Sequence, residues 1–322
     1  MGGGGLTTYV ARRVLIALGL VYIVTTIVFL VLHVIPGDPA MLLLSGGGVD
    51  PSAEAVAELR RKLGLDQPIF TQYIDYLAGL LQGDLGNSFQ DDHPVAAEIA
   101  KRLPRTIELI LAAALLSVLT GLPLGTLAAL RQGGITDRSL SLVAGLMLSV
   151  PVFVTGTLLV LVFAQKLQWV PAGGFVEWSR DPIRHLIHLL MPAVTIAMGL
   201  SAVIFRMMRT TVLETLQQEW VRTARAKGLS GRSVLLRHVV RNALGPVLTV
   251  LGLHMGTLLG GTVLVEYVFN WPGLSGFLVV AVETRDYPEV QGIVLVISFL
   301  FILLNLLVDL LYSVLDPRIR LE

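Results

Sequence analysis

Residues 219–228 read Glu-Trp-Val-Arg-Thr-Ala-Arg-Ala-Lys-Gly, and this short basic stretch lies between two strongly apolar runs. Its composition favours a helix, and Gly228 can adopt the left-handed conformation that ends one. Several charged side chains so close together do not enter hydrocarbon. The stretch therefore lies at a water-facing surface, where the apolar runs on either side hold it.

The composition of the whole chain is that of an integral membrane protein. Of 322 residues, 54% are hydrophobic and 15% are charged, whereas a typical soluble domain carries about 25% charged residues. The mean hydropathy of +0.75 agrees. The chain has no cysteine, which excludes disulfides, thiolate metal sites and a catalytic thiol. Nucleic-acid binding has no support, because the basic residues lie next to membrane spans.

Six charge-free runs are long enough to cross a hydrocarbon core of about 30 Å as helices. They predict an all-α integral membrane fold with six transmembrane helices. The predicted spans are residues 14–32, 109–130, 139–165, 189–205, 242–265 and 290–308.

The distribution of charge orients these spans. With the N-terminus inside, the inner segments carry 14 Lys and Arg against 6 Asp and Glu, and the outer segments carry 10 against 17. The net charges are +8 inside and −7 outside. Because basic residues concentrate on the cytoplasmic side of membrane proteins, both termini are predicted to be cytoplasmic, together with the stretch at 219–228.

Residues 33–108 form the longest external segment. Asp50 and Pro51 predict the N-cap and first position of a helix that ends at Gly64, and Pro68 opens a second helix. The segment is interpreted either as a helical cap on the membrane surface or as a docking surface for an external partner, and the residues alone favour neither.

Other features predict packing around the spans. Gly252, Gly256 and Gly260 recur at four-residue spacing, which favours helix packing within the chain over a subunit interface. Residues 274–282 are apolar but too few to cross, so an interfacial or re-entrant helix is expected. Trp271 and Tyr287 are typical of a membrane–water boundary.

Few polar side chains lie inside the spans, and these are candidates for a pathway. His254 and Asn305 are the candidates, with a buried hydrogen-bonded role as the alternative for His254. Arg206 and Arg209 are expected to extend to the cytoplasmic interface. His185 and His188 share a helix face, but no third ligand lies nearby in the sequence, so a metal site is not expected.

The sequence lacks the common catalytic motifs. It contains no Walker A loop, no G-x-S-x-G elbow and no H-E-x-x-H. The chain is therefore expected not to be an enzyme and not to hydrolyse ATP itself. A transporter that uses ATP but has no ATPase of its own needs a cytoplasmic helix on which a separate ATPase can act, and residues 219–228 provide one.

The chain resembles the permease subunits of dipeptide/oligopeptide ABC importers over nearly its whole length. The residues that carry the resemblance are Ile35-Pro36-Gly37-Asp38-Pro39, Leu63-Gly64-Leu65-Asp66-Gln67-Pro68, Gly83-Asp84-Leu85-Gly86, Arg222 to Gly228, Arg241-Asn242-Ala243-Leu244, Phe269-Asn270-Trp271-Pro272-Gly273-Leu274, Arg285-Asp286-Tyr287-Pro288, Asn305 to Tyr312 and Asp316-Pro317-Arg318.

The resemblance implies a type I importer in the cytoplasmic membrane of a bacterium or archaeon. It implies a second homologous permease, two cytoplasmic ATPase subunits that bind ATP-Mg, and an external substrate-binding protein as partners. No cofactor is implied for this chain. The domains implied are 1–94, the first transmembrane helix with the external segment; 95–315, the five-helix importer domain with a coupling loop at 210–241; and 316–322, a cytoplasmic tail.

In this family the stretch at 219–228 corresponds to the EAA loop, whose coupling helix docks on the ATPase. Arg222-Thr223-Ala224 match its first positions, Gly228 its glycine and Pro246 its later proline. We expect Trp220 to anchor the helix, Arg222 and Arg225 to pair with acidic groups of the ATPase, and Ala224 to allow close approach. The residues assigned to coupling are Glu219, Trp220, Arg222, Thr223, Ala224, Arg225, Lys227 and Gly228.

Three alternatives remain at this point. The basic stretch is also compatible with attraction to anionic lipid headgroups. The whole chain is also compatible with a stand-alone secondary transporter or channel, or with a membrane scaffold. The substrates associated with the resembling family include dipeptides, oligopeptides, glutathione, nickel and some sugars, and the sequence does not select among them.

Overall fold

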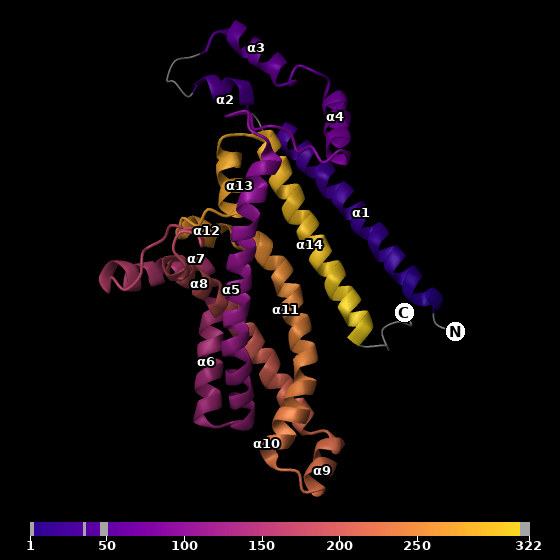
Figure 1. Cartoon of the computed structure of the whole chain (residues 1–322), viewed down its shortest axis with the longest axis vertical. Coiled ribbons are helices and arrows are strands. Elements are labelled where there is room, and N and C mark those ends of the chain that lie inside the picture. The colour runs from indigo at the N-terminus through magenta and orange to yellow at the C-terminus, as the bar shows by residue number, and fades with distance from the viewer. Residues whose placement is uncertain (1–2, 35–36, 46–50, 316–322) are drawn as a thin grey trace. The chain divides into compact units, whose positions relative to one another are not determined.

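The computed structural model describes residues 3–34, 37–45 and 51–315. Contacts divide the chain into two compact units, Met1–Thr106 with Pro272–Leu306 and Ile107–Trp271 with Leu307–Glu322. Among the described residues, five helices are long and apolar enough to cross a membrane, and a bent pair of helices is a sixth candidate. The predicted all-α membrane fold is confirmed (Figure 1).

The first unit contains the long N-terminal helix and the external segment. Its core joins the end of the first helix to Val95, Phe277 and Ile293, all of them buried. The predicted short helix at 274–282 forms and contributes to this core. The helices of the unit, besides the first turns of α5, are α1 (Gly3–Val34), α2 (Pro39–Ser45), α3 (Ala53–Lys62), α4 (Ile69–Leu81), α13 (Leu274–Glu283) and α14 (Tyr287–Leu315) as far as Leu306.

The caps of the external helices differ in one detail from the prediction. Ser52 is the N-cap of α3, and its Oγ accepts a hydrogen bond of 3.2 Å from the Ala55 N–H. Pro51 thus precedes the cap and is not the first helical residue, because the hydroxyl of Ser52 satisfies a free N–H of the first turn. Asp50 lies outside the described residues. Gly64 has a φ of +69°, the left-handed conformation expected of a glycine that ends a helix.

A buried carboxylate ties the external loop to the start of α14. Asp286 is fully buried and accepts hydrogen bonds from Ser88 Oγ at 2.6 Å and from the Phe89 N–H at 2.8 Å. A third, longer bond of 3.3 Å comes from the Gln90 N–H. Tyr287 is also buried, 8% exposed, and it packs in the core of the unit; its position at the membrane–water boundary stays a prediction.

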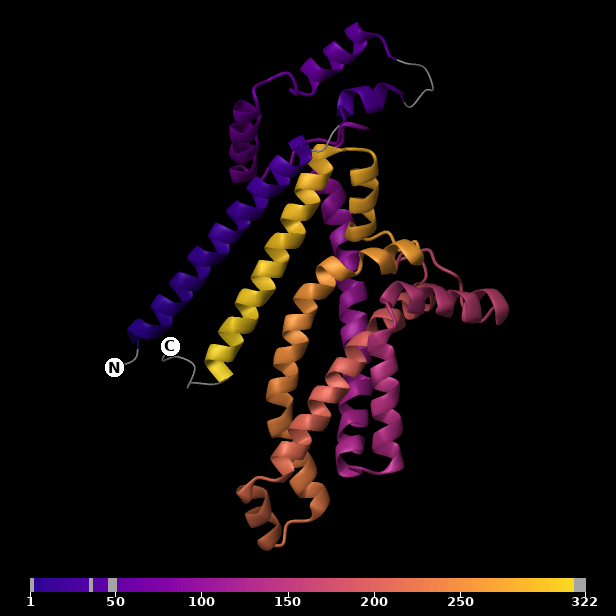
Figure 2. The ribbon, with the colours of Figure 1, turned by 180° about the vertical axis from the view of Figure 1, so that it is seen from behind.

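The second unit is a helical bundle in which α8 packs against α6, α7 and α11 (Figure 2). Its elements are α5 (Val95–Leu130, shared with the first unit), α6 (Ile135–Ser149), α7 (Val152–Leu159), the π-helix η1 (Val160–Lys166), α8 (Pro182–Leu216), α9 (Glu219–Ala226), α10 (Gly231–Ser233), the π-helix η2 (Val234–Val240), α11 (Arg241–Gly261) and α12 (Val263–Val268).

Helices α5 and α8 approach closely at two glycines. A Cβ built on Gly121 would lie 2.8 Å from Ile204 Cγ2, and one on Gly125 would lie 2.7 Å from the Phe205 carbonyl oxygen. Any larger residue there would force the helices apart. Close approach through small residues replaces the hydrophobic driving force that is missing between helices in lipid.

The third predicted span, residues 139–165, is not one straight helix. It breaks between α6 and α7, which are bent by 103°. The cause is Pro151, which has no N–H to continue α6 and disfavours helical torsions at the preceding residue. Val150 is accordingly extended, with φ −91° and ψ 125°.

The loop before α8 is fixed at the outer end of this unit. The Gly174 N–H donates to the Phe269 carbonyl at 2.8 Å, and the Phe175 ring meets Trp271 edge-on at 5.0 Å. Trp271 is 2% exposed, so it packs inside the unit, and its position at the membrane–water boundary stays a prediction. His185 Nδ1 lies 2.7 Å from the Val176 oxygen and its Nε2 lies 2.7 Å from Glu108 Oε1.

Candidate functional site

The stretch at 219–228 forms a short helix with a defined end. Helix α9 covers Glu219–Ala226 and lies beside α10 at one end of the second unit (Figures 1 and 2). At its C-terminus the Gly228 N–H donates to the Arg225 carbonyl at 2.9 Å, and the Leu229 N–H donates to Ala224 at 3.3 Å. Gly228 has a φ of +81°, which confirms that it ends the helix in the left-handed region.

The anchor of α9 is Val221, not Trp220. Val221 is fully buried in a cluster with Val212, Val234 and Val239. Trp220 is 40% exposed, and its ring lies 6.4 Å from that of His238. The prediction that the indole anchors the helix is therefore wrong, because the helical repeat turns position 221 toward the bundle and position 220 away from it.

Ala224 and Thr223 complete the packing of α9. Ala224 lies one turn after Val221 and packs, partly buried, against the same cluster. Its small side chain lets α9 lie close to the bundle. Thr223 Oγ1 donates to the Glu219 carbonyl at 3.1 Å. Helix α9 thus packs against η2 and the hydrophobic cluster of the bundle.

The charged side chains of α9 divide into two sets. Arg222 Nη1 donates to Glu219 Oε1 at 2.9 Å on the exposed face. Arg225 and Lys227 have no carboxylate partner among the described residues. Arg225 lines a polar cavity of ≈ 580 Å³ together with Arg131 of the loop between α5 and α6. The surface of α9 thus carries a net positive charge beside an open cavity.

The two predicted pathway residues belong to different units of the chain. His254 is half-buried in α11, and the bond recorded for it is made by its backbone carbonyl, which accepts from Thr257 Oγ1 at 2.8 Å. Asn305 belongs to the first unit, and its Nδ2 donates to the Phe301 carbonyl at 3.0 Å. The pathway role of either residue stays a prediction.

The glycine series of α11 packs only in part. Gly256 is buried, whereas a Cβ on Gly260 would meet nothing within 4 Å among the described residues. Gly252 is half-buried. Packing within the chain therefore accounts for Gly256 but not for Gly260.

The structure brings together a charged pair that sequence reasoning missed. Arg209 of α8 holds Asp137 of α6 through two bonds, from Nε at 2.6 Å and from Nη2 at 2.8 Å. The Gly133 N–H donates to the same carboxylate at 2.9 Å. Asp137 is 3% exposed. The signal in the sequence was an aspartate directly before an apolar run. A search for long charge-free runs ends each span before such a residue and therefore overlooks it.

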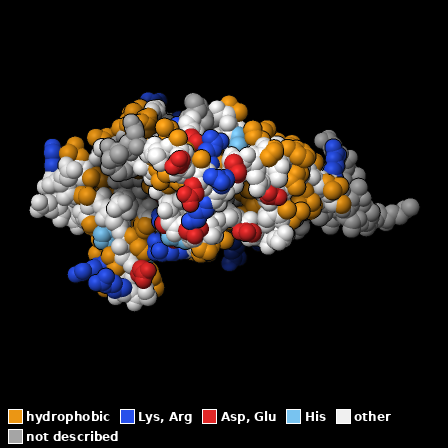
Figure 3. Space-filling view, turned by 90° about the horizontal axis from the view of Figure 1, so that it is seen from above, with side chains coloured by type: hydrophobic (Ala, Val, Ile, Leu, Met, Phe, Trp, Pro, Cys, Tyr) orange, Lys and Arg blue, Asp and Glu red, His pale blue; other side chains and the backbone are white. Residues whose placement is uncertain are grey.

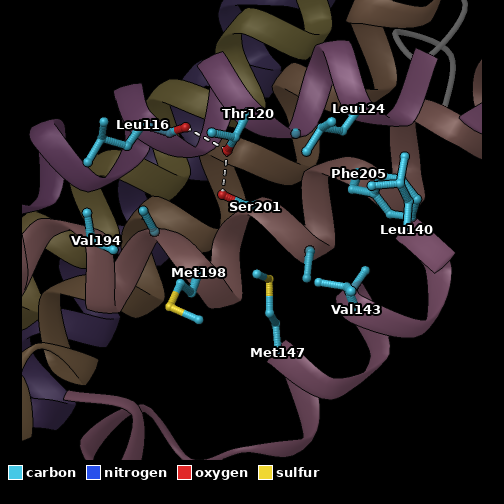
Figure 4. Close-up of a pocket in the computed structure, with 14 residues that line it drawn as sticks. Leu116, Thr120, Leu124, Leu140, Val143, Met147, Val194, Met198, Ser201 and Phe205 are labelled. Atoms are coloured by element: carbon cyan, nitrogen blue, oxygen red, sulfur yellow. Dashed lines mark hydrogen bonds between the residues drawn. The ribbon is translucent and has the colours of Figure 1, made fainter. Parts of the chain in front are cut away.

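An apolar cavity lies between α5, α6 and α8 (Figure 4). Its volume is ≈ 260 Å³, and the side chains labelled around it are mostly aliphatic. Thr120 Oγ1 and Ser201 Oγ share a hydrogen bond of 2.8 Å, so the two hydroxyls satisfy each other. The described residues contain no group of three side chains able to hold a metal ion.

Comparison with known proteins identifies the family. Residues 121–321 match the model of the binding-protein-dependent transport system inner membrane component, and residues 6–110 match the N-terminal model of such membrane components. The chain belongs to this permease family.

Curated relatives match nearly the whole length of the permease. This chain is 41% identical to the glutathione transport system permease protein GsiC of Escherichia coli O6:H1, over 97% of this chain and 98% of that protein. It is 40% identical to GsiC of Escherichia coli K12 over the same shares of both chains.

Solved structures support the fold. The permease resembles a chain of an amino acid ABC transporter with a TM-score of 0.51 and 18% identity, over 69% of this chain and 94% of that one. An inward-facing structure of the MetNI methionine ABC transporter gives a TM-score of 0.52 and 16% identity, over 68% and 96%. The permease is thus an inner-membrane protein with type I importer architecture.

Proposed function

We propose that this permease pairs with a second, homologous permease to form the pathway of an ATP-driven importer for glutathione or short peptides. The observation that carries the proposal is the 41% identity to a glutathione permease over 97% of the chain. Two separate ATPase subunits bind ATP-Mg and supply the energy, and an external binding protein delivers the substrate. A ligand drives such a cycle only by binding one conformation more tightly than the other.

Helix α9 is the element on which the ATPase acts. The buried Val221 belongs to one cluster with Val212 of α8 and Val247 of α11, so a displacement of α9 is expected to move both helices. Its free basic side chains, Arg225 and Lys227, complement acidic groups of an ATPase surface. The ion pair of Glu219 with Arg222 is exposed and contributes little to stability by itself, which leaves both side chains free to exchange partners on docking.

The external segment is the surface for the binding protein. Asp286 holds residues 88–90 in place, and Arg60 of α3 pairs with Asp38 at 3.1 Å. Acidic and basic side chains lie intermixed on the face seen in Figure 3. A charged surface of mixed sign suits a partner that must bind and leave in every cycle, because such contacts favour fast association over tight binding.

Reconstitution of the complete complex tests the proposal. The permease is purified with its co-expressed second permease and ATPases, placed in liposomes, and supplied with the binding protein and radiolabelled glutathione or a dipeptide. Uptake is expected to need both ATP and the binding protein. Uptake by the isolated permease without ATP would instead establish a stand-alone transporter.

A further inference from the structure

Two arginines of α8, one turn apart, extend in opposite directions. Arg209 reaches Asp137 near the start of α6. Arg206 reaches Gly145: a Cβ built on this glycine would lie 3.6 Å from Arg206 Nη2. Asp137 and Gly145 are eight residues apart in α6, about 12 Å along the helix axis. The expectation that both arginines extend to the cytoplasmic interface is therefore wrong for Arg206.

The guanidinium of Arg206 lies beside a residue of the predicted third span. Helix α6 begins at Ile135, directly after the cytoplasmic loop. The predicted span begins at residue 139, so Gly145 lies six residues inside it, about 9 Å along the helix, in a hydrocarbon core of roughly 30 Å. Among the described residues no carboxylate pairs with Arg206, and the side chain is exposed on the surface of this chain. An arginine that faces lipid inside the hydrocarbon is costly, and such residues usually face a partner or a water-filled cavity.

The residues around Arg206 are mostly polar, and those on α6 have small side chains. On α6, Ser141 and Ser149 lie one turn before and after Gly145 on the same face. On α8, Thr210 and Glu214 continue the face of Arg206 toward the cytoplasmic end, and both are exposed. This polar stripe contrasts with the apolar cavity of Figure 4, to which α6 contributes Leu140, Val143, Ala144 and Met147.

We propose that Arg206 is a binding site for the carboxylate of the substrate within the translocation pathway, with the polar stripe of Ser141, Gly145, Ser149, Thr210 and Glu214 as the adjoining wall. This inference rests on the proposed function and names the part of the substrate that the chain recognises. A guanidinium matches a carboxylate with two parallel hydrogen bonds. Glutathione and short peptides carry such a group, and Gly145 leaves room for it beside Arg206.

The absence of cysteine from the chain allows a direct test of the location. Single variants Arg206→Cys and Leu146→Cys are made in the assembled complex, in membrane vesicles. A charged, membrane-impermeant thiol reagent is added, and labelling is measured on the band of this subunit. Leu146 is the control, because it lies at the same depth of α6 and is 58% exposed on another face.

The cysteine at 206 is expected to react at least tenfold faster than the one at 146. Equal, slow labelling of both positions would overturn the assignment to an aqueous pathway. This readout does not depend on which solute is transported, so it separates failure of this inference from failure of the proposed function.

Uptake measurements test whether Arg206 binds the carboxylate of the substrate. Reconstituted complexes with Arg206→Gln are compared with the wild type for a tripeptide with a free C-terminal carboxylate and for its C-terminal amide. Uptake of the free acid is expected to fall at least tenfold, uptake of the amide to change less than twofold, and Arg206→Lys to recover part of the loss. Arg184→Gln is the matched control, since Arg184 lies in the same helix at the exposed outer end.

Each other outcome contradicts the proposal. An equal loss for acid and amide, with less second permease copurified, would show that Arg206 pairs with an acidic residue of that subunit. Unchanged uptake of both peptides would show that Arg206 does not contact substrate. If the wild type takes up neither peptide, the proposed substrate class is wrong, and the labelling ratio alone decides whether Arg206 faces the pathway.

Discussion

At the scale of single residues, charges inside the membrane carry most of the information. Asp137 and Arg209 are 5% and 28% exposed at the side chain and form a bidentate pair, so each neutralises the largely buried charge of the other. Arg206 has no such partner among the described residues. This difference separates a structural arginine from one that is free to bind a ligand.

Breaking the Asp137–Arg209 pair is expected to destabilise the permease strongly. Arg209→Ala leaves a buried carboxylate without its partner, at a cost of about 3 kcal/mol. The double variant Asp137→Asn with Arg209→Gln is expected to recover most of this loss, because no charge remains unpaired. Thermal unfolding of the detergent-solubilised complex measures both variants.

Arg184→Ala serves as the control for this pair. Its ion pair with Asp181 is exposed, 75% and 39% at the two side chains, and such pairs contribute about 0–1 kcal/mol. If Arg209→Ala were no more destabilising than Arg184→Ala, the buried pair would have no structural role.

At the scale of elements, α9 is defined by its anchor and its cap. Its eight residues are too few for a stable isolated helix, so tertiary contacts at Val221 and the left-handed Gly228 hold it. The predicted position and end of the helix are confirmed, whereas the anchor was misassigned. From the sequence alone, the largest apolar side chain, Trp220, is favoured as the anchor. In the structure the anchor is Val221, because that position faces the bundle.

Gly228 and Gly231 form a matched pair for testing the cap. A Cβ on either glycine would meet nothing within 4 Å, but only Gly228 of the two has a positive φ. Gly228→Ala is expected to cost about 1 kcal/mol, roughly fivefold in the population of capped helix. ATP hydrolysis stimulated by the loaded binding protein should fall with it.

Gly231→Ala should leave the stimulated hydrolysis unchanged. An equal response of the two variants would show that open space, not backbone conformation, matters at these positions. Loss of complex assembly in Gly228→Ala alone would place the role of the cap in ATPase docking rather than in the transmission of movement.

At the scale of the whole molecule, long-range ties organise each unit. In the first unit Asp286 joins segments that are 198 residues apart through Ser88. In the second, the close contacts of Gly121 and Gly125 set the spacing of α5 and α8. The family relationship extends over both units, since the two family models match residues 6–110 and 121–321.

Asp286→Asn is expected to loosen the external loop. The amide keeps one oxygen acceptor and sets its NH₂ group against either the donors of residues 88–90 or the Glu289 N–H, at a cost of about 2 kcal/mol. Limited proteolysis in the loop at residues 82–94 should speed up, and the unfolding temperature should fall. Asp91→Asn is the control, because Asp91 is 59% exposed at the side chain; equal proteolysis of both variants would contradict the role of Asp286.

The sequence by itself determined the membrane class, the apolar runs that form the long helices and the short basic helix that ends at Gly228, and it predicts their orientation. These features depend on hydropathy, charge balance and backbone preference, which are local properties of the chain. Tertiary structure alone decided the 103° bend at Pro151, the burial of Val221 in place of Trp220, and the tie between Arg209 and Asp137, 72 residues apart. Such contacts depend on which helix faces come together in space, and the direction in which Arg206 extends becomes visible only when α6 lies beside α8.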